Sequence, residues 1–224
     1  MDFPTGRYPT QMIDVWRLPG GRRVTLRPVL AQDDALFADF LARQSRRALL
    51  QRFHGAVSPQ RASSCAAMAT VDYRTSLALV LTSQEAAGEA VVAEARYVRV
   101  ASPIDASPDG ESAEFALVVD DGWRQLGLGT RLLRCLANHA SERGVRWLYG
   151  NVHENNRAML ALSRRLGFCV SPDGDDAAIL HVERALPLTS VRRPAHLIEL
   201  MPWAWRRLTA ASHNIRLARS TSSE

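Results

Sequence analysis

The sequence contains no lysine, because all 28 of its basic residues are arginine. A genome that favours arginine and alanine codons accounts for this absence. Cysteine is also scarce. Cys65, Cys135 and Cys169 are odd in number and far apart, with no CxxC pair and no histidine at metal-ligand spacing. This pattern excludes a disulfide framework and argues against a zinc site, so we expect a reduced protein without a metal.

Long hydrophobic runs are missing as well. The longest apolar stretches, such as Leu77–Leu81, are far too short to cross a bilayer. Residues 1–20 lack the basic start and apolar stretch of a secretory signal. We therefore expect a cytoplasmic protein with no transmembrane segment.

The positive charge is concentrated at one end of the chain. The net charge is +5, and residues 191–224 hold six of the 28 arginines but two of the 23 acidic residues. The preceding residues are nearly neutral, which argues against a nucleic-acid groove across the body. A chain of 224 residues fits one domain with short extensions.

Hydrophobic periodicity and turn residues predict an α+β sandwich, in which helices cover a mixed, mostly antiparallel sheet. The expected strands are Val24–Arg27, Ser76–Ser83, Gly88–Val100, Ser112–Asp120, Val145–Asn151, Phe168–Val170 and Ala177–Glu183. Ala101–Gly110 is expected to be a loop. One helix is expected to follow Asp33 and Asp34, and the others are Arg46–His54, Pro59–Thr70, Gly127–Arg143 and Asn155–Leu166.

A glycine-rich turn connects the strand ending at Asp120 to an amphipathic helix. Glycines at 127 and 129 remove side chains that would hold a phosphate away, and the unpaired N–H groups of the first helical turn attract an anion. The spacing fits neither GxGxxG nor a Walker loop, which needs a lysine. The turn therefore predicts an anion site of another kind.

The segment Arg124-x-x-Gly127-x-Gly129 resembles the pyrophosphate-binding motif of the GNAT acetyltransferase superfamily (R/Q-x-x-G-x-G/A). The order of expected elements resembles that fold too. Further similarities, closest to the acetyltransferase domain of Pat-type protein lysine acetyltransferases, are Leu26-Arg27-Pro28, Ser45-x(6)-Arg52-Phe53, Glu114-Phe115-Ala116, Asn156–Met159 and Leu166-Gly167-Phe168. The resemblance implies a GNAT domain at 24–186, an N-terminal extension at 1–23 and a basic C-terminal tail at 187–224.

The resemblance also implies acetyl-CoA as co-substrate and assigns residue roles. Glu114 corresponds to the general base. Ser163 stands where many members have a tyrosine as general acid, so either Ser163 relays a proton through water as a catalytic residue, or solvent or another residue protonates the thiolate. A distorted point near Leu117–Val119 would polarise the carbonyl, and this strand would splay from Val145–Asn151 to admit the pantetheine arm. The implied cofactor-binding residues are Leu117, Val118, Val119, Arg124, Gln125, Leu126, Gly127, Leu128, Gly129, Thr130 and Asn156.

Three functions remain open at this point: acetylation of a protein lysine, acetylation of a small amine, and acyl-CoA binding without catalysis. Residues 43–75 contain one acid, Asp72, against six arginines, which favours an anionic or protein acceptor over a small amine in an acidic pocket. The loop glycines and Glu114 favour an active enzyme. The oligomeric state is not indicated.

Overall fold

The computed structural model describes residues 7–53, 68–100, 112–173 and 176–187. The chain divides into units 1–189 and 190–224, and the second lies wholly outside the described residues. The predicted basic tail is therefore described at Pro187 alone. The predicted loop Ala101–Gly110 is outside the described residues, and of the predicted helix Pro59–Thr70 only the last three residues are described.

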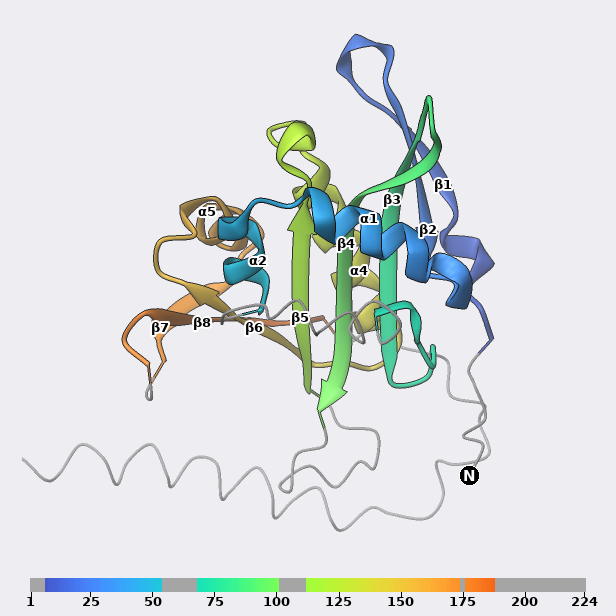
Figure 1. Cartoon of the computed structure of the whole chain (residues 1–224). Coiled ribbons are helices and arrows are strands. Elements are labelled where there is room, and N and C mark those ends of the chain that lie inside the picture. The colour runs from blue at the N-terminus through green and yellow to red at the C-terminus, as the bar shows by residue number, and fades with distance from the viewer. Residues whose placement is uncertain (1–6, 54–67, 101–111, 174–175, 188–224) are drawn as a thin grey trace, which may run out of the picture. The chain divides into compact units, whose positions relative to one another are not determined.

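One eight-stranded sheet forms the centre of the described structure, with the strand order β1-β2-β3-β4-β5-β6-β8-β7. Its neighbours pair antiparallel except β5 and β6, which are parallel. This confirms the predicted mixed sheet (Figure 1). The strands are β1 (Asp14–Arg17), β2 (Arg23–Pro28), β3 (Ser76–Glu85), β4 (Gly88–Val100), β5 (Ser112–Val119), β6 (Trp147–His153), β7 (Cys169–Pro172) and β8 (Ile179–Ala185).

Strand β1 lies inside the stretch that the sequence assigned to an N-terminal extension. Residues Asp14–Arg17 pair with β2 from Leu26 back to Arg23. Trp16 packs into the main core and is 3% exposed. The sheet therefore begins upstream of Val24, within the predicted N-terminal extension.

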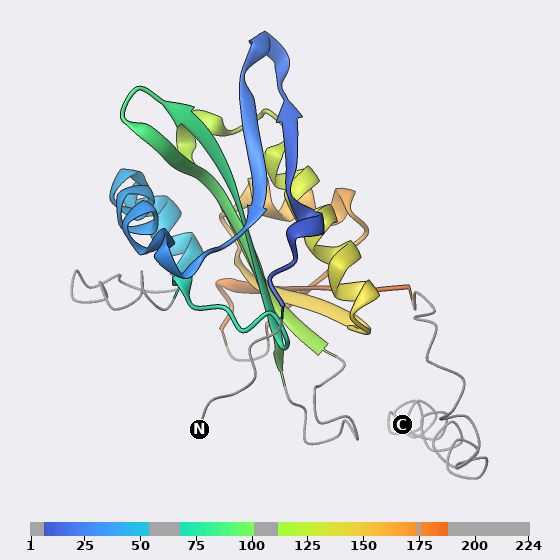
Figure 2. The same ribbon diagram turned by 90° about the vertical axis from the view of Figure 1, so that its right-hand side faces the viewer.

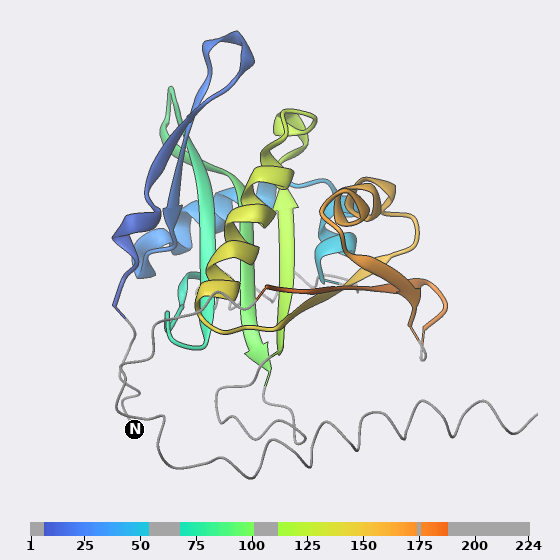
Figure 3. The ribbon, with the colours of Figure 1, turned by 180° about the vertical axis from the view of Figure 1, so that it is seen from behind.

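Helices cover both faces of the sheet (Figure 2). Helices α1 (Asp34–Arg43) and α2 (Arg46–Phe53) lie on one face, and α4 (Leu128–Glu142) and α5 (Arg157–Arg165) lie on the other, as the view from behind shows (Figure 3). α4 buries its leucine stripe against the sheet because residues three and four apart share a helix face. The buried residues of this stripe are Leu128, Leu132, Leu133, Leu136 and Ala140.

A separate apolar cluster lies on each face. The larger joins α4, the sheet and residues of α5, whereas the smaller joins Phe37 and Phe40 of α1 to Val80 and Val118 of the sheet. Each fully buried side chain of this kind contributes about 1.5–3 kcal/mol by leaving water. The two clusters hold β5 between them, and this strand carries the site.

Two predicted boundaries shift for identifiable reasons. β6 begins at Trp147 rather than Val145, because the Val145 N–H donates to Ala140 O and completes the exit from α4. α5 begins at Arg157 because Asn156 caps it. In the described part of the chain, no helix is both long and apolar enough to span a membrane.

Candidate active site

Strands β5 and β6 separate halfway along their length. Their parallel pairing covers three residue pairs and ends at Glu114 with Tyr149. Beyond that point β5 stays paired with β4 as far as Val119, and β6 stays paired with β8 as far as His153. We call the gap between β5 and β6 beyond Glu114 and Tyr149 the fork. It opens into a pocket beside α2 and α5, lined by Gln51, Arg52, Glu114, Phe115, Ala116, Leu117, Gly150, Asn151, Val152, Asn156 and Met159. The predicted splay of these strands is present.

Gly150 lies where the two strands part. A Cβ atom at this position would lie 2.9 Å from the carbonyl oxygen of Phe115, so only glycine allows this close approach. The Phe115 ring packs against Phe168, with 5.3 Å between ring centroids, and fills the space on the α4 side. Glycine and the aromatic pair thus fix the base of the fork.

The open edge of β5 presents backbone groups to the fork. The Asp120 N–H donates to Val92 O of β4. Backbone N–H groups alternate sides along a strand, so the N–H groups of Leu117 and Val119 point away from β4, toward the fork. Val118, which is also predicted to bind the cofactor, does not line the pocket. It pairs with Glu94 in β4, and its side chain packs in the α1-side cluster.

The expected distortion of β5 is not found. Its pairing with β4 runs without a register shift from Ser112 to Val119. The irregularity of the neighbouring pair lies between Leu81 and Thr82 of β3 instead. Open N–H groups at the fork therefore arise because β6 diverges, and not because β5 bulges.

The predicted phosphate loop has the backbone of an anion-binding turn. Gly127 has φ of 76° and precedes α4, and Gln125 also has a positive φ of 61°. The Arg131 N–H makes the first helical bond, to Gly127 O. The N–H groups of Leu128–Thr130 consequently have no acceptor within the helix, which leaves them for an anion.

Gly129 has a second role in packing. A Cβ atom there would lie 3.0 Å from Leu162 Cδ1 and 3.5 Å from Leu117 Cδ2. Glycine therefore lets α4 start close to both α5 and β5. The close approach of Gly129 to Leu162 and Leu117 places the loop next to the fork, so one extended ligand can contact both.

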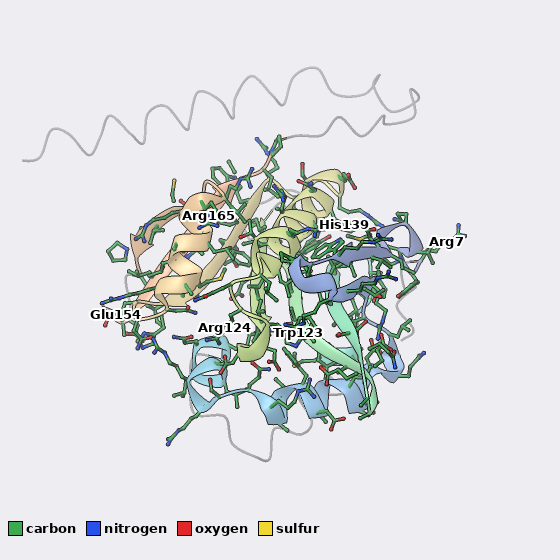
Figure 4. All side chains as sticks on the ribbon, turned by 90° about the horizontal axis from the view of Figure 1, so that it is seen from above. Arg7, Trp123, Arg124, His139, Glu154 and Arg165 are labelled. Atoms are coloured by element: carbon green, nitrogen blue, oxygen red, sulfur yellow. The ribbon has the colours of Figure 1, made fainter. Side chains whose placement is uncertain are left out.

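Charged side chains surround the loop at the end of the molecule seen in Figure 4. Arg124 is half exposed and pairs with Asp121 at 2.5 Å. The Arg22 guanidinium stacks on the ring of Trp123 at 3.5 Å, which ties the β1–β2 hairpin to the loop. Arg124 thus remains at the surface, where it can pair with a phosphate.

Asn156 both caps α5 and lines the pocket. Its side-chain oxygen accepts the Met159 N–H at 3.2 Å and caps α5, while the residue also lines the pocket. Because the oxygen is engaged, the amide NH₂ is the group left to meet a ligand.

Glu114 lies at the fork with an exposed side chain, and the ion pairs of the described residues include none to it. Its neighbour across the fork is Tyr149. Burial raises the pKa of the Tyr149 hydroxyl, and the negative charge of Glu114 raises it further. A carboxylate that is exposed and unpaired can accept a proton from a bound amine.

Ser163 is not brought to the site. Its side chain is fully buried, it does not line the pocket, and its hydroxyl has no hydrogen-bond partner among the described residues. A proton donor must reach the leaving group. This placement gives no support to Ser163 as the proton donor, because the α5 position faces the core.

Sequence reasoning missed the α2 wall of the pocket. Arg52 contacts Glu94, a carboxylate with no exposed surface, at 3.5 Å, and Arg96 pairs with the same carboxylate. Gln51 reaches Asn155 at 3.2 Å and fastens α2 to the start of α5. Gly150 carried a usable signal, since a glycine inside a strand often marks close backbone approach. The α2 contacts carried none.

An opened parallel strand pair beside a glycine loop defines a protein that binds a phosphorylated, extended acyl carrier. Residues 23–169 match the model of the acetyltransferase (GNAT) domain, and the chain belongs to this family. The protein is therefore a GNAT-family acetyltransferase, and its co-substrate is acetyl-CoA, as in the rest of the family.

Relatives agree with this assignment. An acetyltransferase of Pseudomonas aeruginosa is 29% identical over 165 residues, covering 73% of this chain and 85% of that protein. The GNAT domain of S. lividans PAT has a TM-score of 0.68 at 22% identity, covering 80% of this chain and all (100%) of that one. A phosphinothricin acetyltransferase from Sinorhizobium meliloti, in complex with AcCoA, has a TM-score of 0.56 at 18% identity, covering 79% and 96%. These structures are similar in fold.

Proposed function

We propose that the protein acetylates a lysine side chain of another protein by direct transfer from acetyl-CoA, with Glu114 as general base. The observation that carries the proposal is the fork itself. Pairing of β5 with β6 ends at Glu114, so an exposed carboxylate stands where the open edge of β5 begins. A cofactor bound along that edge would end beside this carboxylate.

The fork and loop suit different parts of acetyl-CoA. The N–H groups of Leu128–Thr130, with Arg124, would hold the pyrophosphate. The edge of β5 at Leu117 and Val119 would bond the pantetheine arm as an added strand does. The NH₂ group of Asn156 would contact the arm from α5.

Chemistry would follow at the fork. Glu114 takes a proton from the lysine ammonium, whose reference pKa is about 10.4, and frees the amine. The amine nitrogen would then attack the thioester carbonyl, and a backbone N–H of β5 that faces the fork would stabilise the oxyanion. The attacking nitrogen would lose its second proton to solvent, the C–S bond would break, and the thiolate would take a proton from solvent, because Ser163 is out of reach.

The likeness to the GNAT domain of S. lividans PAT supports a protein acceptor, as do the sequence similarities to Pat-type domains. The exposure of Glu114 supports it too, since a small amine enzyme would enclose its acceptor. Acetylation of a small amine and binding without catalysis are the competing functions. The absence of lysine adds that this chain has no lysine side chain to acetylate in itself.

The test measures thiol release from acetyl-CoA with lysine peptides and with small amines. We expect peptide-dependent release in the native chain, and Glu114→Gln should lower kcat about 10²- to 10⁴-fold. Binding of acetyl-CoA should persist in this variant, measured by calorimetry. Glu142→Gln, an exposed substitution on α4, is the matched control and should behave as the native chain.

Two outcomes would reject the proposal. Turnover of small amines without turnover of peptides would identify a small-molecule enzyme. Binding of acetyl-CoA without release by any acceptor would identify a non-catalytic module.

A further inference from the structure

The sheet face that carries Glu114 presents a row of side chains from four strands. Residues paired in register lie on the same face of a sheet, so Val98 of β4, Glu114, Tyr149 and Glu183 of β8 form one row. Neighbouring strands are about 4.8 Å apart, which places Glu114 and Glu183 about 10 Å from each other. Two carboxylates therefore flank one tyrosine on this face.

Exposed apolar side chains border this row. Val98 is 46% exposed, and the next row contains Val100 at 38% and Trp147 at 47%. These are three of the six large apolar side chains exposed in the described part of the chain, and all three lie on this face. Such a concentration beside polar groups is typical of an interaction surface.

The two carboxylates of the row have no arginine partner among the ion pairs of the described residues, unlike five other acids. Within the described residues, Asp33, Glu89, Glu94, Asp120 and Asp121 each pair with an arginine. Among the ion pairs of the same residues, Glu114 has none and Glu183 has only one, with His181, whose Nε2 lies 3.7 Å away. Glu114 and Glu183 thus form no direct ion pair with an arginine of the described residues, although Arg52 lines the same pocket as Glu114.

His181 also holds the face in shape. Its ring stacks on Tyr149, with 5.4 Å between centroids, and its Nδ1 bonds Asn151 Oδ1 at 3.2 Å. The tyrosine between the carboxylates is therefore fixed against β8. A flat aromatic ring between two carboxylates suits the apolar stem and cationic head of a long basic side chain.

We propose that this face binds a segment of the acceptor protein in the polyproline II conformation, which carries a second cationic side chain three residues from the acetylated lysine. The target ammonium lies at Glu114 and the second cation at Glu183. Polyproline II has three residues per turn and rises about 3.1 Å per residue, so side chains three residues apart point to the same side about 9 Å apart, close to the separation of the carboxylates. Apolar side chains of the segment pack on Val98 and Trp147. This inference rests on the function proposed above.

The test uses two peptides that contain one lysine each and differ at one position, three residues after the lysine, where one has arginine and the other glutamine. We expect kcat/KM to be about three- to fivefold higher for the arginine peptide, as for a partly exposed ion pair. Glu183→Gln should bring the ratio of the two values to about one. Glu142→Gln, outside this face, should keep the native ratio.

A charge reversal keeps the test decisive if the neutral variant gives a small change. Glu183→Arg should invert the preference, so that a peptide with glutamate at the variable position exceeds the arginine peptide. Circular dichroism checks that both variants fold. Equal values for the native chain, or a ratio unaltered by Glu183→Gln, would overturn the second-cation subsite while lysine acetylation stands. Turnover of neither peptide would overturn both proposals.

Discussion

The two sides of the fork differ in what they are made of. On the side proposed for the cofactor, the groups offered to a ligand are chiefly backbone N–H groups of the loop at residues 127–130 and of the β5 edge, with the side chains of Arg124 and Asn156 beside them. On the acceptor side they are side chains, chiefly Glu114, Glu183 and Trp147. A site built from backbone N–H groups requires glycines at fixed positions in the sequence. A site built from side chains of several strands depends on how those strands are paired.

This difference predicts that substitutions on the two sides have separable effects. Changes that close the backbone edge should weaken acetyl-CoA binding, and changes in side chains on the α2 side should act on stability or on the acceptor. Glu94 is buried beneath the side proposed for the acceptor, while Gly150 and Asn156 line the pocket proposed for the cofactor. Variants of these three residues test the separation.

The largest effect is expected at Glu94. Glu94→Gln should lower the free energy of unfolding by about 3–5 kcal/mol, because it leaves the guanidinium groups of Arg52 and Arg96 without their buried carboxylate. Urea unfolding followed by circular dichroism measures it. Glu142→Gln, at an exposed position, should change stability by no more than about 0.5 kcal/mol. A loss below about 1 kcal/mol for Glu94→Gln would show that α2 does not depend on this cluster.

The sequence was informative where a feature is local. The glycines at 127 and 129, the capping Asn156 and the leucine stripe of α4 all occur at fixed spacing within one segment. These patterns predicted the fold class and the anion-binding turn, and the structure confirms the fold. Strand β1 was missed because its four residues give too little periodicity.

Features set by tertiary pairing were beyond the sequence. Val118 faces β4 and Ser163 faces the core, and each assignment depends on a neighbour distant in the chain. The row from Glu114 to Glu183 requires the register of three strands at once. The row therefore emerges from the strand register and from no single motif.

A smaller effect is expected in the fork itself. Gly150→Ala places a Cβ atom 2.9 Å from Phe115 O, and the strands must move apart. We expect a loss of about 1–3 kcal/mol in stability, as in overpacked cores, together with weaker acetyl-CoA binding. Gly122→Ala is the control, since its Cβ would lie an ordinary 3.5 Å from Asp120 Oδ1. Unchanged acetyl-CoA affinity in Gly150→Ala, measured by calorimetry, would separate the pocket from cofactor binding.

The smallest effect, and the one that divides structure from binding, is expected at Asn156. Asn156→Ala removes the oxygen that accepts the Met159 N–H and should cost about 1 kcal/mol of stability. Asn156→Asp keeps that oxygen, so stability should stay near the native value, but it replaces the NH₂ group by a carboxylate facing the pocket. Both variants should weaken acetyl-CoA binding. If Asn156→Asp binds acetyl-CoA as the native chain does while Asn156→Ala alone is unstable, Asn156 is a helix cap and does not contact the cofactor.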